Sequence, residues 1–326
     1  MDVVVTSAPL RGPGPGPVRR GLAAVGAFAL GGIFLFAAYA KLIDPIAFAD
    51  VIRDEGLDLL FSAKTVAQLA IGVEVGLGLA LVLGVRTRSV LVLTTGLVAF
   101  FLFLTGRAYL YDKMGWADAK TSCGCFGNLV HRSPSEALLQ DALMLIPTLG
   151  AAWLAPTPGS PAPLRRVLAS LVATVGAVVF AVAAPNLPLD DLATRLSPGR
   201  RVDELCTAAE QKCLRDALPL LVEGRHVVVL TDLDEPAFRE AIPELNGYAA
   251  DGKGPRLWVL TAAPAETVTM FGFATGASFP IQVTDKAIVR PLYRRLPRSF
   301  HVIDGVVTAT WDGLPPLRSL SATPPG

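Results

Sequence analysis

Charged residues are scarce in this chain of 326 residues. Asp, Glu, Lys and Arg make up 17% of the sequence, whereas hydrophobic residues make up 52%. Because a soluble domain usually carries about 25% charged residues, this composition indicates a membrane protein. The net charge is only +1, and no basic block or basic–aromatic interleaving occurs, so the sequence argues against a nucleic-acid partner.

Cysteine is also rare, with four residues in the whole chain. That number is too small for a fold built on disulfides, but it is enough for two pairs. One pair lies in the stretch "TSCGCFG", residues 121–127, and the other consists of Cys206 and Cys213. These pairs are the first candidates for chemistry.

Long uncharged runs are abundant. Residues 21–40 contain no charge, and twenty such residues cross a hydrocarbon core of about 30 Å. We interpret this run as a membrane span and not as a signal peptide, because further spans follow and no small-residue cleavage site stands out. The four further predicted spans cover about 65–85, 89–106, 136–155 and 167–184.

Five spans place the two chain ends on opposite sides of the membrane. By the same count, the loop of about 107–135 and everything after residue 185 share one side. Short basic segments flank the spans on the other side, which is typical of cytoplasmic loops. These segments contain Arg19 and Arg20, Arg86 and Arg88, and Arg165 and Arg166. The sequence therefore predicts a cytoplasmic N-terminus and an extracytoplasmic C-terminal region.

Polar residues occur at or inside the predicted spans. Lys41 can extend to the membrane interface at the end of the first span, and Asp44-Pro45 can stop that helix. Glu74 lies in the middle of the second span, where an ionisable group normally faces the bundle interior. Glu74 is either part of a proton relay or redox site, or a protonated carboxyl bonded to another helix. Asp141 is expected to cap the fourth span.

These motifs follow one another in a recognisable order. "AKLIDP" ends the first span, the glutamate of "IGVEVGLGLAL" lies in the second, and "SCGCFG" follows the third. Over residues 18–155 this order resembles the MauE branch of the DoxX-like membrane proteins, although "LLQDALML" departs from it near Asp141. MauE is named for methylamine utilisation and is associated with disulfide formation and maturation of methylamine dehydrogenase. The resemblance implies thiol chemistry in a bacterial inner membrane.

Cys123 and Cys125 are the predicted catalytic pair. Residues i and i+2 reach the Cα separation of a disulfide in a bent turn, and Gly124 allows the bend. Such a small ring is strained, and strained bridges tend to be oxidising and catalytic. Phe126 and Gly127 complete the motif.

The supporting residues of this predicted redox site are Lys41, Asp44 and Glu74, and its expected partners are extracytoplasmic protein thiols or disulfides. A quinone is a candidate electron partner, although no quinone motif is visible. Two alternatives remain open for the two cysteines. They could form an inert turn or bridge, or they could bind copper or zinc with His131, although no fourth metal ligand is evident.

The chain after residue 185 has a soluble composition with alternating strand and helix patterns, which indicates a βαβ core. The order of these elements resembles the TlpA-like branch of the thioredoxin fold. In that family a cis-proline lies beside the active site, which makes Pro297 a peptide-binding candidate. The family's Cys-x-x-Cys pair would fall on residues 235–238, which read "EPAF", so this domain lacks it.

Cys206 and Cys213 are seven residues apart. In one unbroken helix their Cα atoms would be separated by about 10.5 Å, too far for a disulfide. If a helix begins only near Gln211, a loop can bring the two together, and we favour that bridge. The alternatives are two buried thiols on one helix face, or a second working redox pair.

The predicted organisation is a transmembrane α-helical bundle followed by an α/β thioredoxin-like domain. Its parts are a disordered tail (1–17), a four-helix membrane domain (18–155), a linker with a fifth span (156–185) and an extracytoplasmic domain (186–326). The predicted function is thiol-disulfide exchange or disulfide-dependent enzyme maturation. The alternatives are a non-catalytic membrane-anchored assembly factor or chaperone, and a metal-binding membrane protein.

Overall fold

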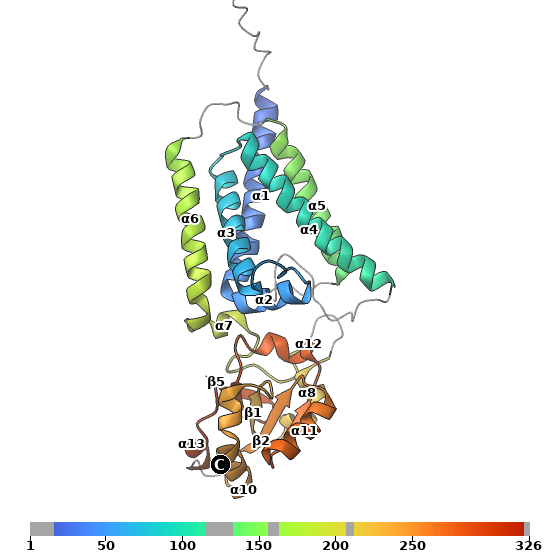
Figure 1. Ribbon diagram of the computed structural model, residues 1–326, viewed down its shortest axis with the longest axis vertical. Helices are drawn as coiled ribbons and strands as arrows, with labels where there is room; N and C mark the ends of the chain where they lie inside the picture. Colours follow the sequence, from blue (N-terminus) through green and yellow to red (C-terminus); the bar gives the residue numbers. More distant parts are fainter. Residues whose placement is uncertain (1–15, 115–132, 156–162, 207–211, 323–326) are drawn as a thin grey trace, which may run out of the picture.

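The computed structural model describes residues 16–114, 133–155, 163–206 and 212–322. They form a helical bundle and, at one end of it, a sheet domain (Figure 1). The helices of the bundle are α1 (Pro17–Ile43), α2 (Pro45–Asp54), α3 (Ala63–Val82), α4 (Arg88–Met114), α5 (Pro134–Trp153) and α6 (Leu164–Ala183).

Among the described residues, four helices are long and apolar enough to cross a membrane, namely α1, α3, α4 and α6 with its continuation to Asn186. The chain is therefore a multi-pass membrane protein. The remaining long helix, α5, corresponds to the predicted span from residue 136 and packs beside α1 and α4 (Figure 1). It is not among the four because its hydropathy is reduced by Glu136, Gln140, Asp141 and Pro147. The predicted span 136–155 therefore stays a prediction, and with it the total of five spans.

Small residues bring the helices of the bundle close together. A Cβ atom on Gly31 of α1 would lie 2.6 Å from the Gly78 oxygen of α3, and one on Gly26 would lie 2.4 Å from the Ala151 Cβ of α5. A Cβ atom on Gly76 of α3 would lie 2.3 Å from Thr174 Oγ1 of α6. Such contacts suit membrane helices, which associate through close packing and not through the hydrophobic effect.

The short helix α2 lies across the end of the bundle nearest the sheet domain (Figure 1). Asp44 separates it from α1 and caps it, since the Ala47 N–H donates to Asp44 Oδ1 at 3.0 Å. Pro45 at the first helical position suits this start, because the missing N–H would have no partner there. The expectation that Asp44-Pro45 stops the first helix is therefore correct, and a second helix starts at once.

A five-stranded mixed sheet in the order β3-β2-β1-β4-β5 forms the C-terminal domain. Its strands are β1 (Arg225–Leu230), β2 (Arg256–Thr261), β3 (Ile281–Val283), β4 (Arg298–Ile303) and β5 (Val306–Asp312). The first three run parallel, while β4 is antiparallel to β1 and to β5. The β4–β5 hairpin turns at Asp304 and Gly305, which have φ of 48° and 77°.

Short helices lie between the bundle and the sheet and around the sheet (Figure 1). They are η2 (Ala184–Asn186), α7 (Asp190–Ala193), α8 (Leu214–Ala217), η3 (Pro219–Val222), α9 (Pro236–Glu240), α10 (Ile242–Asp251), α11 (Ala265–Thr275), α12 (Lys286–Val289), η4 (Arg290–Leu292) and α13 (Leu317–Ala322). The helix α12 has only one turn, because Pro291 cannot continue an α-helix.

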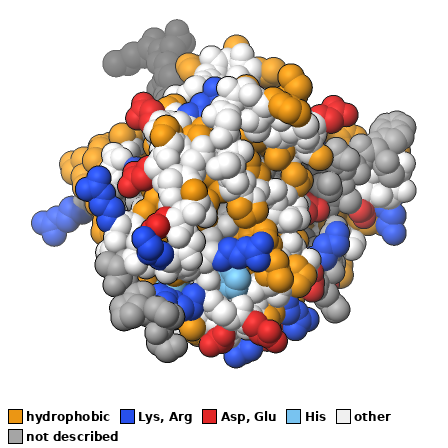
Figure 2. All heavy atoms as spheres, turned by 90° about the horizontal axis from the view of Figure 1, so that it is seen from below, with side chains coloured by type: hydrophobic (Ala, Val, Ile, Leu, Met, Phe, Trp, Pro, Cys, Tyr) orange, Lys and Arg blue, Asp and Glu red, His pale blue; other side chains and the backbone are white. Residues whose placement is uncertain are grey.

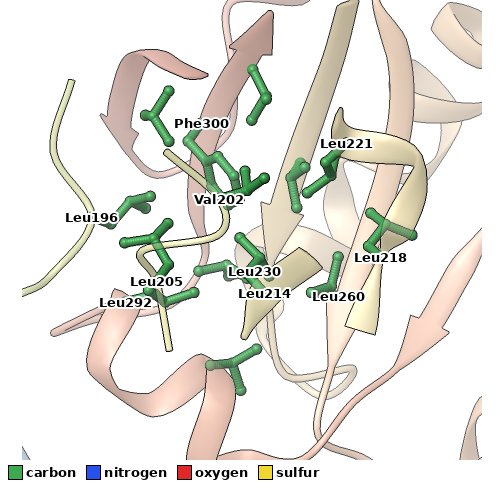
Figure 3. Close-up of a cluster of buried hydrophobic side chains, with 14 of the residues drawn as sticks. Leu196, Val202, Leu205, Leu214, Leu218, Leu221, Leu230, Leu260, Leu292 and Phe300 are labelled. Atoms are coloured by element: carbon green, nitrogen blue, oxygen red, sulfur yellow. The ribbon is translucent and has the colours of Figure 1, made fainter. Parts of the chain in front are cut away.

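Both faces of the sheet are buried. Side chains alternate along a strand, so Val228 and Leu230 of β1 face one core while Val227 and Val229 face the other. Figure 3 shows the first core, where leucines 214, 218 and 221 pack with Phe300. From the sheet-domain end, basic and acidic side chains are interspersed over the surface, as expected for a face in contact with water (Figure 2).

Candidate functional site

The segment 115–132 holds the predicted catalytic pair, and it lies outside the described residues. This applies to Cys123, Gly124, Cys125, Phe126 and Gly127. The described helices on either side are informative, since α4 ends and α5 begins at the end of the bundle that faces the sheet domain (Figure 1). At that end Ser133 accepts a hydrogen bond from the Glu136 N–H at 3.3 Å, and Glu136 accepts one from the Ser133 N–H.

A buried ion pair joins Lys41 of α1 to Glu74 of α3. The two side chains are 1% and 0% exposed, so the prediction that Lys41 extends to the membrane interface is wrong. The physical reason is the partner: a carboxylate on a neighbouring helix compensates the ammonium, which would otherwise have to leave the low-dielectric interior. Glu74 faces the bundle interior, as expected, but its partner was not identified from the sequence.

Aromatic rings surround the ammonium. Lys41 Nζ lies 5.0 Å from the ring centre of Phe48 on α2 and 5.1 Å from that of Phe101 on α4. Within the described part of the chain, Glu74 Oε2 is buried and accepts no hydrogen bond. The pair therefore connects three helices and the crosswise helix α2, and it leaves one carboxylate oxygen able to bond to a further polar group.

Asp141 also lies in the bundle interior. It is 1% exposed and is placed two turns into α5, so the expectation that it caps that helix is wrong. Ser133 performs the capping instead, because serine directly precedes the Pro134 that starts the helix. Asp141 lines a small apolar space together with Phe34 and Phe101, and Phe101 is one of the two rings beside Lys41.

Asp44 connects the membrane helices to the sheet domain. Its Oδ2 lies 3.8 Å from Arg290 Nη1, and Arg290 Nη2 donates to Asp50 Oδ2 of α2 at 3.1 Å. Burial raises the pKa of the Asp44 carboxyl, and the Arg290 guanidinium opposes that rise. A second contact between α2 and the sheet domain joins Asp54 Oδ2 to Lys286 Nζ at 3.7 Å.

Arg294 makes a deeper contact with the last span. Its side chain is 1% exposed, and Nη2 donates to the Ala184 carbonyl at the end of α6 at 2.8 Å. Nη1 donates to the Leu187 carbonyl at 3.1 Å and lies 3.4 Å from Asp190 Oδ2. One segment of the sheet domain, residues 286–296, therefore docks on both α2 and the end of α6.

A cavity of about 400 Å³ opens at the carboxyl ends of β1 and β2. Its lining includes Thr231 and Thr261 directly at those strand ends, and Lys286 and Tyr293 from the docking segment. Parallel strands commonly place ligands at this edge of a sheet. The helix that follows β1, α9, starts next to the cavity with Glu235 as its N-cap, so the segment "EPAF" lies beside this opening. Phe238 points into the core and is 0% exposed.

The two other predicted features of the sheet domain are also present. The Leu296–Pro297 peptide is cis and directly precedes β4. A disulfide joins Cys206 and Cys213, and the helix α8 starts only at Leu214, so these cysteines do not share a helix. Among the described residues no three His, Cys, Asp or Glu side chains lie together as a metal site. The metal alternative with His131 falls outside those residues.

Comparison with known proteins identifies the membrane half. Residues 19–155 match the family model described as "Methylamine utilisation protein MauE". These residues form a MauE-family region. The resemblance predicted for residues 18–155 is therefore confirmed. A separate search of curated proteins found no match.

The sheet domain lies outside the MauE-family region. Among solved structures, the chain is similar to one named thiol:disulfide interchange protein DsbE from Chlorobium tepidum, with 16% sequence identity and a TM-score of 0.31. The alignment covers 38% of this chain and 90% of that chain. The five-stranded mixed sheet with its helices agrees with the α/β domain predicted after residue 185.

Sequence reasoning missed the docking residues. The MauE-family region presents Asp50 and Asp54 on α2, and the sheet domain presents Arg290 and Lys286 to them. Complementary charge in the sequences "FADVIRDEG" and "DKAIVRPLYRR" was the available signal, but nothing in the sequence states that these segments meet.

Proposed function

We propose that this protein exchanges disulfides with extracytoplasmic protein thiols through Cys123 and Cys125. The observation that carries the proposal is the shared position of two features. The helix ends that flank the Cys-Gly-Cys segment lie at the same end of the bundle as the thioredoxin-like domain (Figure 1). Membership of residues 19–155 in the MauE family gives further support. In this proposal α5 crosses the membrane in addition to the four other spans, and the sheet domain lies outside the cytoplasm of a bacterial cell.

The proposed reaction is a two-electron exchange. One thiolate of a partner protein attacks the Cys123–Cys125 disulfide, and a mixed disulfide forms while the other cysteine leaves as a thiolate. The second partner thiol then breaks the mixed disulfide, so the partner gains a disulfide and loses two electrons and two protons. Cys123 and Cys125 become thiols, and a membrane quinone accepts the two electrons and two protons when the pair is oxidised again.

The sheet domain would hold the partner and not react with it. The cavity beside "EPAF" is open at the sheet edge, but the position has no cysteine to react. In this proposal a partner segment occupies the cavity near Pro297 while its thiols reach the Cys-Gly-Cys segment. The Cys206–Cys213 disulfide then has a structural role. The client class is an extracytoplasmic enzyme whose maturation depends on disulfides.

The buried Lys41–Glu74 pair would support the membrane side of the reaction. It lies in the same region of the bundle as Asp44, which is three residues after Lys41 and caps α2. A carboxylate with one unpaired oxygen can take a proton from a water molecule and pass it on to a bound acceptor. We assign the pair a role in the proton transfers that accompany quinone reduction.

Trapping of thiols with an alkylating reagent in cells tests the redox proposal. Cys123 and Cys125 should change between thiol and disulfide as a quinone is supplied or withdrawn, and Cys123→Ala should abolish partner oxidation. Cys206→Ala/Cys213→Ala is the matched control and should retain partner oxidation in folded protein. The proposal fails if the Cys123–Cys125 pair never changes its oxidation state, or if Cys123→Ala leaves partner disulfides intact.

A non-catalytic assembly factor is the second candidate, and one observation favours it. By the predicted resemblance, the position of one cysteine of a thioredoxin fold is occupied by Phe238, which is a core residue here, while a cavity lies next to the start of this helix. Such a factor would keep its activity in Cys123→Ala and lose it when Thr231→Trp fills the cavity. Metal analysis of the purified full chain separates both from the metal-binding alternative.

A further inference from the structure

Three consecutive apolar side chains are exposed between α2 and α3. Leu59 is 88% exposed, Leu60 is 89% exposed and Phe61 is 59% exposed. They follow the end of α2 and precede Ser62, which caps α3 by accepting a hydrogen bond from the Thr65 N–H. We call residues 59–61 the apolar tip. An apolar run of this kind in contact with water is unfavourable, so it requires a covering partner.

The position of the apolar tip along the bundle is set by the segments that precede and follow it in the chain. Before it, Glu55 pairs with Arg107 of α4, and Arg107 Nη2 also donates to the Glu55 carbonyl at 3.2 Å. Since α4 continues from Arg107 to Met114, this contact lies about 10 Å inside the end of that helix at 1.5 Å per residue. After the tip, the span α3 begins at Ala63. The tip therefore lies level with the ends of the spans and not beyond them.

The neighbouring surfaces identify the partner. Tyr109 and Tyr111 follow Arg107 on α4, and tyrosines are enriched where a bilayer meets water. Along α3, Lys64 is exposed in the first turn, where its ammonium can reach the headgroups, and the exposed apolar side chains beyond it are Leu69 and Val73, which are 52% and 46% exposed on a membrane span. The tip continues this lipid-exposed surface at its edge, so lipid is the occupant that the fold itself brings to it.

We propose that Leu59, Leu60 and Phe61 insert into the lipid leaflet at the sheet-domain end of the bundle. The charged ends of the neighbouring side chains would then lie at the depth of the lipid headgroups, and α2 would lie flat on the membrane surface. Because Asp50 and Asp54 of α2 bind Arg290 and Lys286, the inserted tip also sets the height of the sheet domain above the bilayer. This inference does not depend on the redox chemistry.

Photo-crosslinking in vesicles tests the insertion. The full chain carries p-benzoylphenylalanine in place of Phe61 and is reconstituted in phosphatidylethanolamine–phosphatidylglycerol vesicles. Phe103 of α4 is the matched lipid-facing position, since it is 64% exposed on a span. Phe273 of α11 is the matched position on the sheet domain, since it is 85% exposed.

Lipid adducts, detected by mass spectrometry, should form at position 61 about as often as at position 103, and at least about ten-fold more often than at position 273. A yield at position 61 equal to that at position 273 would overturn the proposal, as would adducts to protein in place of lipid. The same probe in place of Leu60 repeats the measurement at the most exposed residue, and it should give the same ranking.

Discussion

The two halves of this molecule bury their cations in different ways. In the membrane half, Lys41 is compensated by one carboxylate on another helix and by two aromatic rings. In the sheet domain, Arg294 is compensated mainly by backbone carbonyls, those of Ala184 and Leu187, with Asp190 in addition.

The difference follows from where free backbone acceptors occur. Carbonyls inside a membrane helix are engaged in the helix's own hydrogen bonds, so a buried cation there needs a side-chain partner. A helix end leaves its last carbonyls without intrahelical partners, and Arg294 uses those at the end of α6. The bundle interior therefore depends on the single Lys41–Glu74 pair, whereas Arg294 distributes its interactions over two carbonyls and one carboxylate.

Removal of the Glu74 carboxylate should have the largest effect. Glu74→Leu leaves the Lys41 ammonium buried without its partner, and breaking a buried pair in this way costs about 3–5 kcal/mol. The melting temperature of the chain in detergent should fall accordingly. The double change Lys41→Met/Glu74→Leu should recover most of the loss. If the single and double variants melt together, the ion pair does not hold the helices as described.

Removal of the Arg294 guanidinium should have a smaller effect. Arg294→Met loses hydrogen bonds from a charged donor to two carbonyls, which we expect to cost about 2–3 kcal/mol, and the freed carbonyls at the helix end can bind water. Hydrogen exchange at residues 184–190 should rise. The control is Arg295→Met, an exposed neighbour 3.5 Å from Asn186 Oδ1, which should change stability by less than about 0.5 kcal/mol. If Arg294→Met and Arg295→Met changed stability equally, the hydrogen bonds of Arg294 would not hold the sheet domain to the end of α6 as described.

Acidification should have the smallest effect, and it should act on the sheet domain. Burial, with smaller contributions from Arg225 and His226, lowers the pKa of His301 from its ordinary 6.5. The unfolded state therefore binds a proton at His301 more readily than the folded state does. The contribution of neutral His301 to the stability of the folded state is present above pH 6.5, and it is lost as the pH falls from 6.5 toward the folded pKa. His301→Gln should flatten the dependence of the sheet domain's melting temperature on pH between 7.5 and 5. An unchanged slope would exclude His301 as its source.

Much of the fold could be predicted because its signals are local. Uncharged runs of twenty residues mark spans, and short continuous apolar runs such as "HVVVL" mark strands that are buried on both faces. The Asp304-Gly305 turn and the stop of the first helix at Asp44-Pro45 were equally readable, whereas the helix α2 that starts at Pro45 was not predicted. The assignment of α5 as a span was less secure, because Gln140 and Asp141 interrupt its apolar face.

The candidate site was less predictable because its contacts are long-range. Lys41 and Glu74 are 33 residues apart, and each alone suggested a different role: an interfacial lysine and a protonated carboxyl. Only the packing of α1 on α3 brings them together. The chemistry assigned to Cys123 and Cys125 stays a prediction, since the structure describes the helices beside them and not the segment itself.

The docking segment has a consequence for how the sheet domain is best studied. Residues 286–296 hold the domain to α2 and α6, and Lys286, Val289, Tyr293 and Leu296 of the same segment form one wall of the cavity. A fragment cut at residue 186 would keep the sheet but lose the Asp44, Asp50 and Asp54 carboxylates that anchor this wall. Binding measured on such a fragment would therefore describe a differently shaped pocket, and inhibitor or peptide screens need the membrane helices attached.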